Sequence, residues 1–303
     1  MLHNDKNTFE QLILRTSDYL GVKAEIVEKD YFVTLFLKRI ADVMPDIVFK
    51  GDTSLSKCYH IIKRFSEDID LNLQSEIKPS VNKRKQLKTN IIQIINDLEF
   101  ELTNADAIKS RRDYNRYIID YPSSLSVVYL KEQLIVETAI YQRAYPTKLM
   151  QADSLIYQYL HENGYDIYAE QYDLKPFELN VQTAERTLLD KLYALADYYL
   201  LNTTTEHSRH IYDIFKLSEI IKVDDTLKDL AKSVADERRS HKMCLSVQSE
   251  TNVTEVLHEV INKKIYKADY EAITIPLLFE SISYDTAISA LKAILQNGIF
   301  DKV

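Results

Sequence analysis

The stretch from residue 48 to residue 73 limits what this chain can fold into more than any other. It begins as a short apolar strand, turns at Gly51, continues as a short helix and ends in a second strand that carries Asp68 and Asp70. Polar and apolar residues alternate in that second strand, so the two carboxylates face one side while the residues between them enter the core. Two aligned carboxylates repel each other, and a fold that aligns them usually supplies a cation. We therefore expect Mg²⁺ here, bound by these carboxylates and by the phosphates of a substrate.

Composition narrows the class of protein. The 303 residues include only four Gly and six Pro, which favours long regular elements over a loop-rich β architecture. The hydrophobic fraction of 46% and the charged fraction of 28% are ordinary for a soluble globular protein. The N-terminus lacks the plan of a signal peptide, no apolar run is long enough to span a membrane, and Cys58 and Cys244 show no metal-ligand spacing. We expect a soluble, cytoplasmic protein without a disulfide framework.

The charge distribution leaves two interpretations open. The net charge of −8 argues against a protein that coats nucleic acid non-specifically. Positive charge is nevertheless dense in three short segments, 83–85, 109–116 and 238–242. Such clusters are either solvated surface or contacts for an RNA backbone, and solvated surface is the commoner case.

The spacing of apolar residues predicts an α+β fold. Helices come first, a strand-rich region follows, and helices return from about residue 181 onward. The expected helices before that point are 7–20, 23–43, 78–98 and 149–160, and the expected strands after Asp70 are 100–103, 114–121, 125–130 and 134–141. The last two strands are expected to form a hairpin. We place an α/β core with its N-terminal helices at residues 1–165 and a helical domain at residues 166–303.

Glu137 is the acidic residue of the expected strand 134–141. It shares a face with Ile135, Ala139 and Tyr141. Two interpretations fit it equally well, namely a solvent-facing carboxylate on an edge strand and a third ligand for the metal. The second requires that this strand lie beside the strand of Asp70, which the sequence does not establish.

Two charged helices stand out in the C-terminal half. The first has Thr183 as its expected N-cap and carries Lys191 beside an apolar stripe. In the second, Arg209, Asp213 and Lys216 lie at i, i+4 and i+7 and share one face. Periodicity alone favours an ordinary solvent-side ion pair for that charged face.

The turn at Gly51 is suited to phosphate. A helix that follows a tight Gly turn presents its first backbone N–H groups outward, and Thr53 or Ser54 is the expected cap. Mg²⁺ at Asp68 and Asp70 would complete a site for in-line attack at phosphorus. The chain lacks both the Gly-x-x-x-x-Gly-Lys-Ser/Thr and the Gly-x-Gly-x-x-Gly motifs, which argues against P-loop and dinucleotide-binding folds.

This combination resembles the nucleotidyltransferase superfamily, in which a hydrophobic-Gly-Gly/Ser turn precedes an Asp-hydrophobic-Asp-hydrophobic strand. More closely, the chain is similar to the AbiEii/AbiGii toxins of bacterial toxin–antitoxin and abortive-infection systems, relatives of the MenT-like toxins. The motifs that carry the resemblance recur in order over roughly residues 20 to 220, at 26–33, 49–55, 64–71, 185–191 and 209–217.

The resemblance implies a fold and an activity. The fold is a nucleotidyltransferase-like mixed sheet with flanking helices, followed by a helical C-terminal domain that completes the active-site cleft. The activity depends on Mg²⁺, with Mn²⁺ as an alternative metal, and transfers a nucleoside monophosphate from an NTP to an acceptor hydroxyl. A tRNA or another RNA is the expected acceptor, a cognate antitoxin protein is the expected partner, and no membrane is involved.

The same resemblance assigns roles to single residues. Asp68, Asp70, Lys191 and Asp213 would be catalytic: the two aspartates of the strand bind the metal, Lys191 reaches the triphosphate and Asp213 completes the set. Glu137 is the candidate third metal ligand and base. The expected nucleotide-binding residues are Gly51, Thr53, Ser54, Ser66, Arg209 and Lys216.

One residue departs from the family pattern. The family usually has Gly-Gly-Thr where this chain has Gly51-Asp52-Thr53, so a negative side chain stands beside the expected phosphate path. Either Asp52 points away or phosphate binding is altered. Two alternative functions stay open: nucleotidyl modification of a protein or a small molecule by the same core, and a nucleotide-binding module without turnover.

Overall fold

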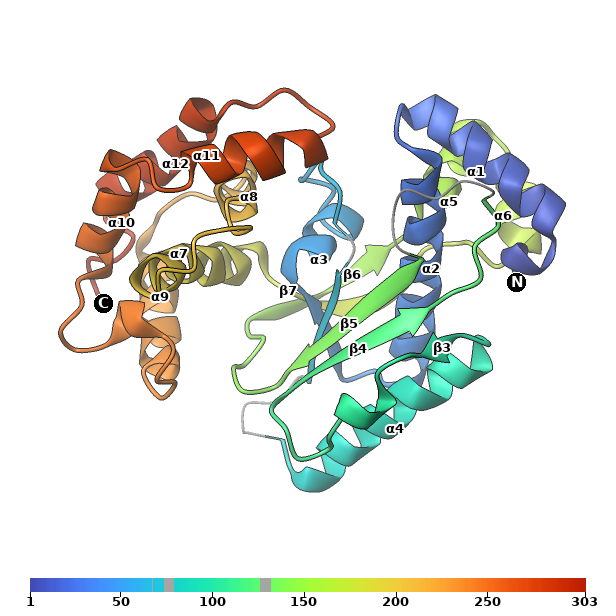
Figure 1. Ribbon diagram of the computed structural model, residues 1–303, viewed down its shortest axis with the longest axis horizontal. Helices are drawn as coiled ribbons and strands as arrows, with labels where there is room; N and C mark the ends of the chain where they lie inside the picture. Colours follow the sequence, from blue (N-terminus) through green and yellow to red (C-terminus); the bar gives the residue numbers. More distant parts are fainter. Residues whose placement is uncertain (67, 74–78, 126–131) are drawn as a thin grey trace. The chain divides into compact units, whose positions relative to one another are not determined.

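A mixed β-sheet forms the centre of the first part of the chain (Figure 1). The computed structural model describes residues 1–66, 68–73, 79–125 and 132–303. Within these residues seven strands form one sheet, in the order β3-β4-β5-β2-β1-β7-β6. β1 pairs in parallel with β7, and β2 with β5, whereas the other neighbours are antiparallel. The strands are β1 (Ile47–Lys50), β2 (Asp68–Leu73), β3 (Glu101–Leu102), β4 (Tyr114–Asp120), β5 (Gln133–Ala139), β6 (Thr147–Ala152) and β7 (Phe177–Gln182).

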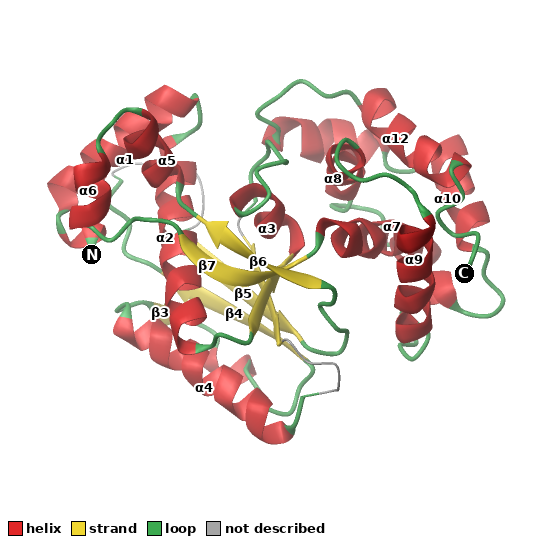
Figure 2. Cartoon of the chain, turned by 180° about the vertical axis from the view of Figure 1, so that it is seen from behind, coloured by secondary structure: helices red, strands yellow, loops and turns green. Residues whose placement is uncertain are grey.

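Helices α2 and α4 share one hydrophobic core with this sheet (Figure 2). Phe36 of α2, Ile91 of α4 and Leu71 of β2 are fully buried in it. Because side chains alternate along a strand, this packing leaves Asp68 and Asp70 on the other face of the sheet. The helices that accompany the sheet are η1 (Leu2–Asn4), α1 (Lys6–Leu20), α2 (Ala24–Val43), α3 (Gly51–Lys57), α4 (Val81–Asp97), η2 (Ala105–Ala107), α5 (Leu155–Glu162) and α6 (Asp166–Gln171).

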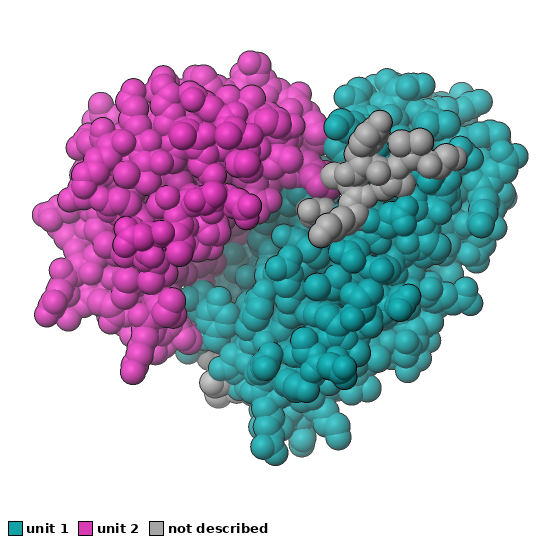
Figure 3. Space-filling model, in the orientation of Figure 1, with its two compact units in different colours: residues 1–60, 66–182 teal, residues 61–65, 183–303 magenta. Residues whose placement is uncertain are grey.

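The chain divides into two compact units (Figure 3). The first consists of Met1–His60 and Ser66–Gln182 and contains the sheet, and the second consists of Ile61–Phe65 and Thr183–Val303. Backbone hydrogen bonds from Phe65 to Leu277 and from Phe279 to Lys63 tie the short segment to the second unit. The helices of the second unit are α7 (Ala184–Leu200), α8 (Arg209–Ser218), α9 (Asp225–Arg238), η3 (Leu245–Val247), α10 (Val253–Asn262), α11 (Lys267–Asp269), η4 (Tyr270–Thr274), η5 (Ile275–Leu277) and α12 (Tyr284–Gln296).

The structure confirms the predicted α+β fold and most of its elements. The helices expected at 7–20 and 23–43 are α1 and α2, and Thr183 caps α7 as predicted by accepting the backbone N–H of Arg186. The strand expected at 125–130, with its hairpin, falls on residues 126–131, which lie outside the described part of the chain. No described helix combines the length and the apolar character that a membrane span requires.

Two differences from the predicted elements concern β6 and β7. The helix expected from 149 to 160 is wrong over its first four residues, which belong to the edge strand β6. Leu149 there is 60% exposed, so no buried alternation marks the segment as a strand. The contacts divide the chain after Gln182 rather than at the expected limit of 165, because β7 pairs with β1 and stays with the sheet.

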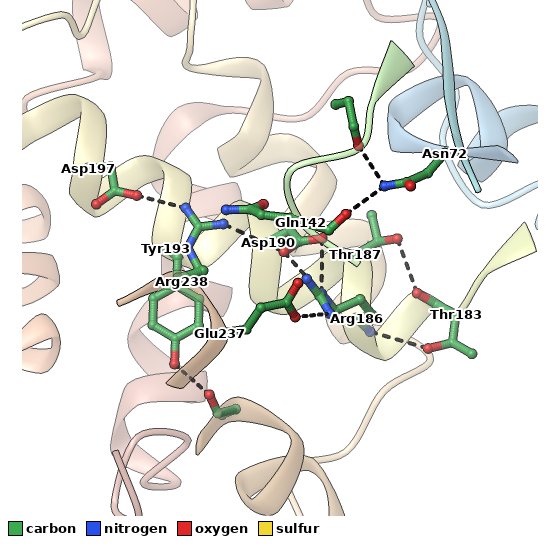
Figure 4. A network of polar contacts seen from close by, with 12 residues as sticks. Asn72, Gln142, Thr183, Arg186, Thr187, Asp190, Tyr193, Asp197, Glu237 and Arg238 are labelled. Atoms are coloured by element: carbon green, nitrogen blue, oxygen red, sulfur yellow. Dashed lines mark hydrogen bonds and ion pairs between the residues drawn. The ribbon is translucent and has the colours of Figure 1, made fainter. Parts of the chain in front are cut away.

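A network of buried and partly buried ion pairs, centred on Arg186 and Arg238, links α7 to α9 in the second unit (Figure 4). Arg238 Nη2 donates to Asp197 Oδ2 at 2.7 Å, and both side chains are 8% exposed. Arg186 pairs with Asp190 at 3.2 Å and with Glu237 at 3.4 Å. Arg238, the first residue of the basic cluster 238–242, is therefore not a surface charge, because it links α9 to α7.

Asp197→Asn is predicted to lower the free energy of unfolding by about 3 kcal/mol, because it removes the carboxylate nearest to the buried Arg238 guanidinium. Urea unfolding measures the loss. Lys232→Met is the control, since it breaks an exposed pair with Asp236 on the same helix and should change stability by less than about 0.5 kcal/mol. Equal effects of the two substitutions would contradict the assignment.

Candidate active site

The predicted strand–turn–helix–strand forms as β1, α3 and β2. β1 ends at Lys50, and Gly51 follows with φ of +74°, in the left-handed region that favours glycine. The chain then returns as β2, antiparallel to β1, with Asp70 opposite Lys50. The strand, turn, short helix and second strand predicted for residues 48–73 are therefore confirmed.

Four charged residues lie opposite one another across four adjacent strands. Lys50 of β1 faces Asp70 of β2, Asp70 faces Glu137 of β5, and Glu137 faces Arg116 of β4. Arg116 Nε approaches Glu137 Oε1 at 3.5 Å. Residues in register on neighbouring strands point to the same face of a sheet. Asp70 and Glu137 are therefore adjacent carboxylates with a cation on either side, which answers the question of strand order that the sequence left open.

The neighbouring charges shift the pKa of Asp70. Burial is the main reason that the pKa of Asp70 rises to about 6; the negative charges of Glu137, Asp52 and Asp68 add to the rise, and Lys50 opposes it. A bound divalent cation would favour the charged carboxylate and reverse this shift. Carboxylates are the hard oxygen ligands that Mg²⁺ and Mn²⁺ prefer. Asp68, Asp70 and Glu137 thus share a face of the sheet and the chemistry of metal ligands, and metal binding there stays a prediction.

Gly51 lies directly against the carboxylate of Asp70. A Cβ atom added to Gly51 would stand 2.1 Å from Asp70 Oδ2 and 2.8 Å from its Cγ. Glycine is required here both by the backbone conformation and by the lack of space. The glycine of the turn therefore has a second role that the sequence did not reveal, which is to make room for a carboxylate.

The hydroxyl groups near the turn bond to the backbone and to each other. Thr53 Oγ1 donates to the carbonyl oxygen of Asp68 at 2.6 Å and lies 2.8 Å from Ser66 Oγ, and Ser54 Oγ donates to the carbonyl oxygen of Gly51 at 2.7 Å. Thr53 and Ser54 are buried. The expectation that one of them caps α3 is wrong, because the helix already begins at Gly51. Nucleotide binding by Gly51, Thr53, Ser54 and Ser66 stays a prediction.

In the second unit, Asp213 is held by two cations. Arg64 Nε and Nη2 donate to its two carboxylate oxygens at 2.7 and 2.8 Å, and Lys191 Nζ donates to Oδ2 at 2.7 Å. The side chains of Arg64 and Asp213 are 0% exposed and that of Lys191 is 5% exposed. Asp213 therefore does not lie on the solvent face that helical periodicity favoured. A bidentate arginine and a lysine fix its position.

The two other charged residues predicted on α8 have different surroundings. Lys216 Nζ pairs with Glu219 at 2.7 Å and with Glu280 at 3.5 Å. Arg209 is the first residue of the helix and is half-buried. Their assignment to nucleotide binding stays a prediction.

Sequence reasoning did not single out Lys50, Arg116 or Arg64. Lys50 and Arg116 occupy ordinary strand positions, and only the register of the sheet shows that they flank the two carboxylates. Arg64 lies in a family motif, yet no local pattern predicts its bond to a carboxylate 149 positions later in the chain. Membership of that motif was the one signal that pointed to it.

Gly51→Ala is expected to destabilise the protein more than Gly21→Ala. Both glycines have positive φ, +74° and +66°, but a Cβ at Gly21 would meet nothing within 4 Å. The Gly21 variant therefore measures backbone strain alone, about 1 kcal/mol, whereas the clash with Asp70 should raise the loss at Gly51 to about 3 kcal/mol. Urea unfolding of both variants gives the difference. Equal losses would show that Asp70 does not approach Gly51.

Comparison with known protein families bears on this geometry. A family model described as "Nucleotidyl transferase AbiEii toxin, Type IV TA system" matches residues 35–297, a range that includes both groups of candidate residues. No curated protein matches the chain. The family match confirms the resemblance seen in the motifs, and it covers most of the chain. This protein belongs to the AbiEii nucleotidyl transferase toxin family of type IV toxin–antitoxin systems.

Proposed function

We propose that this protein transfers a nucleoside monophosphate from an NTP to an acceptor hydroxyl, with Mg²⁺ or Mn²⁺ bound at Asp68 and Asp70. Family membership supports nucleotidyl transfer, an NTP substrate and a cognate antitoxin as partner. The observation that carries the proposal is the register of β2 with β5, in which Asp70 and Glu137 are neighbours on the face that also bears Asp68. A metal ion bound there would neutralise phosphate charge and orient the attacking and leaving oxygens.

Glu137 is the candidate base, whether or not it also binds the metal. Its side chain is 23% exposed, so an acceptor hydroxyl has access to it. Tyr114 donates a hydrogen bond to it and Arg116 approaches it, and both contacts restrict its orientation. A carboxylate so placed would accept the proton of the hydroxyl as it attacks.

Lys191 is the candidate for neutralising the charge that develops on the triphosphate. Asp213 holds the Lys191 ammonium group at 2.7 Å and is itself held by Arg64, so the cation is positioned before a substrate binds. We assign Asp213 to the catalytic set for this reason, and Arg209 and Lys216 to nucleotide binding on the strength of the family resemblance.

An RNA acceptor, tRNA first, fits a basic surface on the first unit. We define the basic surface as the exposed cations of the first half of α4 and of the segment after η2, namely Lys83, Lys85, Lys109, Arg111 and Arg112. The two segments are adjacent, because Arg84 Nη1 donates to the carbonyl oxygen of Arg111 at 3.4 Å and Lys88 Nζ to that of Ile108 at 2.9 Å. Such a density of positive charge in a chain of net charge −8 suits a phosphate backbone.

Asp52 favours one alternative, a nucleotide-binding module without turnover. It stands in the first turn of α3, and its charge contributes to the raised pKa of Asp70. An additional carboxylate there would alter the position of a bound triphosphate. Tight binding of Mg²⁺-NTP without transfer to any acceptor would favour the module, and separate assays with RNA, protein and small-molecule acceptors distinguish the transferase alternatives.

Asp70→Asn is predicted to reduce transfer of label from an NTP to total tRNA by about 100-fold or more, because it removes a carboxylate that the metal needs. Purified protein, Mg²⁺ and each labelled NTP in turn provide the assay. Glu178→Gln is the control, an exposed carboxylate on β7 of the same sheet, and should transfer as the wild type does. Undiminished transfer by Asp70→Asn would exclude the metal assignment.

The combined variant Lys83→Glu, Lys85→Glu and Arg111→Glu is expected to raise KM for tRNA and to flatten its salt dependence, while KM for the NTP stays unchanged. Each lost phosphate contact should reduce the slope of log affinity against log salt by about one. Lys292→Glu, at an exposed lysine of α12, is the control. If the combined variant keeps the wild-type KM and slope, RNA binds elsewhere.

A further inference from the structure

A buried ion pair joins α2 to the end of α3 in the first unit. Lys57, the last residue of α3, donates from Nζ to Asp30 Oδ1 at 2.6 Å and to Thr34 Oγ1 at 2.5 Å. The same group donates to the carbonyl oxygen of Asp153 at 3.1 Å, and the second oxygen of Asp30 accepts the backbone N–H of Leu155 at 2.8 Å. The side chains of Lys57 and Asp30 are 4% and 15% exposed. We call this set of contacts the α3 anchor.

The beginning of α3 contacts the candidate metal ligands. Its first residue, Gly51, lies against the Asp70 carboxylate, and Thr53 Oγ1 donates to the carbonyl oxygen of Asp68 at 2.6 Å. The helix has seven residues, so it is about 10 Å long. Because the helix is so short, a displacement of Lys57 would also move the first turn of α3. The anchor and the two carboxylates lie at opposite ends of one short, stiff element.

Stability alone does not explain an ion pair at this position. The cost of removing two charges from water largely offsets their attraction, and an apolar pair of similar volume is often as stable. The ion pair differs from an apolar contact in direction, because the Lys57 ammonium group donates to three acceptors, two of them on α2, in one arrangement. These directional bonds fix the position of the C-terminal end of α3 more tightly than apolar packing would.

We propose that Asp30 and Lys57 are positioning residues that fix α3, so that its first turn holds Asp68 and Asp70 in the geometry that metal binding and transfer require. This inference rests on the proposed function of that carboxylate face. Asp30 belongs to the sequence motif 26–33 and precedes the range 35–297 that the family model matches. None of the candidate site residues lies in the motif 26–33, and the α3 anchor gives this motif a role.

Three variants test the proposal: Asp30→Asn, Lys57→Met and the two combined. Lys38→Met is the matched control, because Lys38 pairs with Asp173 at a more exposed position about two turns further along α2. Each protein is examined by hydrogen exchange of the α3 amides, by urea unfolding and by NTP-transfer kinetics.

Asp30→Asn should speed exchange in α3 about tenfold and lower kcat about tenfold, with KM for the NTP changed less than about threefold. The double variant leaves neither charge buried, so its unfolding midpoint should return towards that of the wild type while kcat stays low and α3 exchange stays fast. Lys38→Met should match the wild type in all three measurements. Recovery of kcat and of slow α3 exchange together with stability in the double variant would show a purely structural pair and overturn the proposal.

Failure of this inference and failure of the proposed function give different results. A wild-type chain that transfers no label under any condition contradicts the proposed function. Exchange in α3 that is the same in the wild type, Asp30→Asn and the double variant contradicts the anchor, and this measurement does not depend on turnover.

Discussion

The close approach of two like charges, Asp70 on β2 and Glu137 on β5, is the constraint on which the candidate site depends. Parallel pairing of these strands sets carboxylates opposite each other, an arrangement that is unfavourable unless the charge is compensated. Lys50 and Arg116 compensate it from the two flanking strands, β1 and β4, and Gly51 leaves the space that Asp70 occupies. Asp68 adds a third carboxylate near these two cations, and we propose that a divalent metal ion balances this excess of negative charge.

The second unit contributes different chemistry. There a single buried carboxylate, Asp213, is surrounded by donors, with the guanidinium of Arg64 and the ammonium of Lys191 directed at its two oxygens. In the proposed function, the first unit supplies oxygen ligands for the metal and Lys191 of the second unit neutralises phosphate charge. Both are held by buried ion pairs or by packing against glycine rather than by flexible surface contacts, which is the form that electrostatic preorganisation takes in catalytic sites.

The parts of the site that the sequence predicted are those determined within one short segment. Gly51, Asp68 and Asp70 belong to a continuous strand–turn–helix–strand, where period-two alternation and a single glycine decide the geometry. The position of Glu137 beside Asp70 depends on which strands pair, and the burial of Asp213 depends on Arg64 from a distant segment, so neither follows from local periodicity. The cap expected at Thr53 or Ser54 was wrong because the helix starts earlier, at Gly51, and the strand at Leu149 was missed because an exposed edge strand shows no alternation of burial.

The central claim is that the carboxylate face of the sheet binds the metal of an NTP. A crystal structure of the protein with Mg²⁺ and a non-hydrolysable NTP analogue tests it most directly. The account predicts one metal ion with oxygens of Asp68 and Asp70 at about 2.1 Å in octahedral geometry, sharing the remaining positions with phosphate oxygens and water. A metal and triphosphate bound elsewhere, with neither aspartate among the ligands, would contradict it.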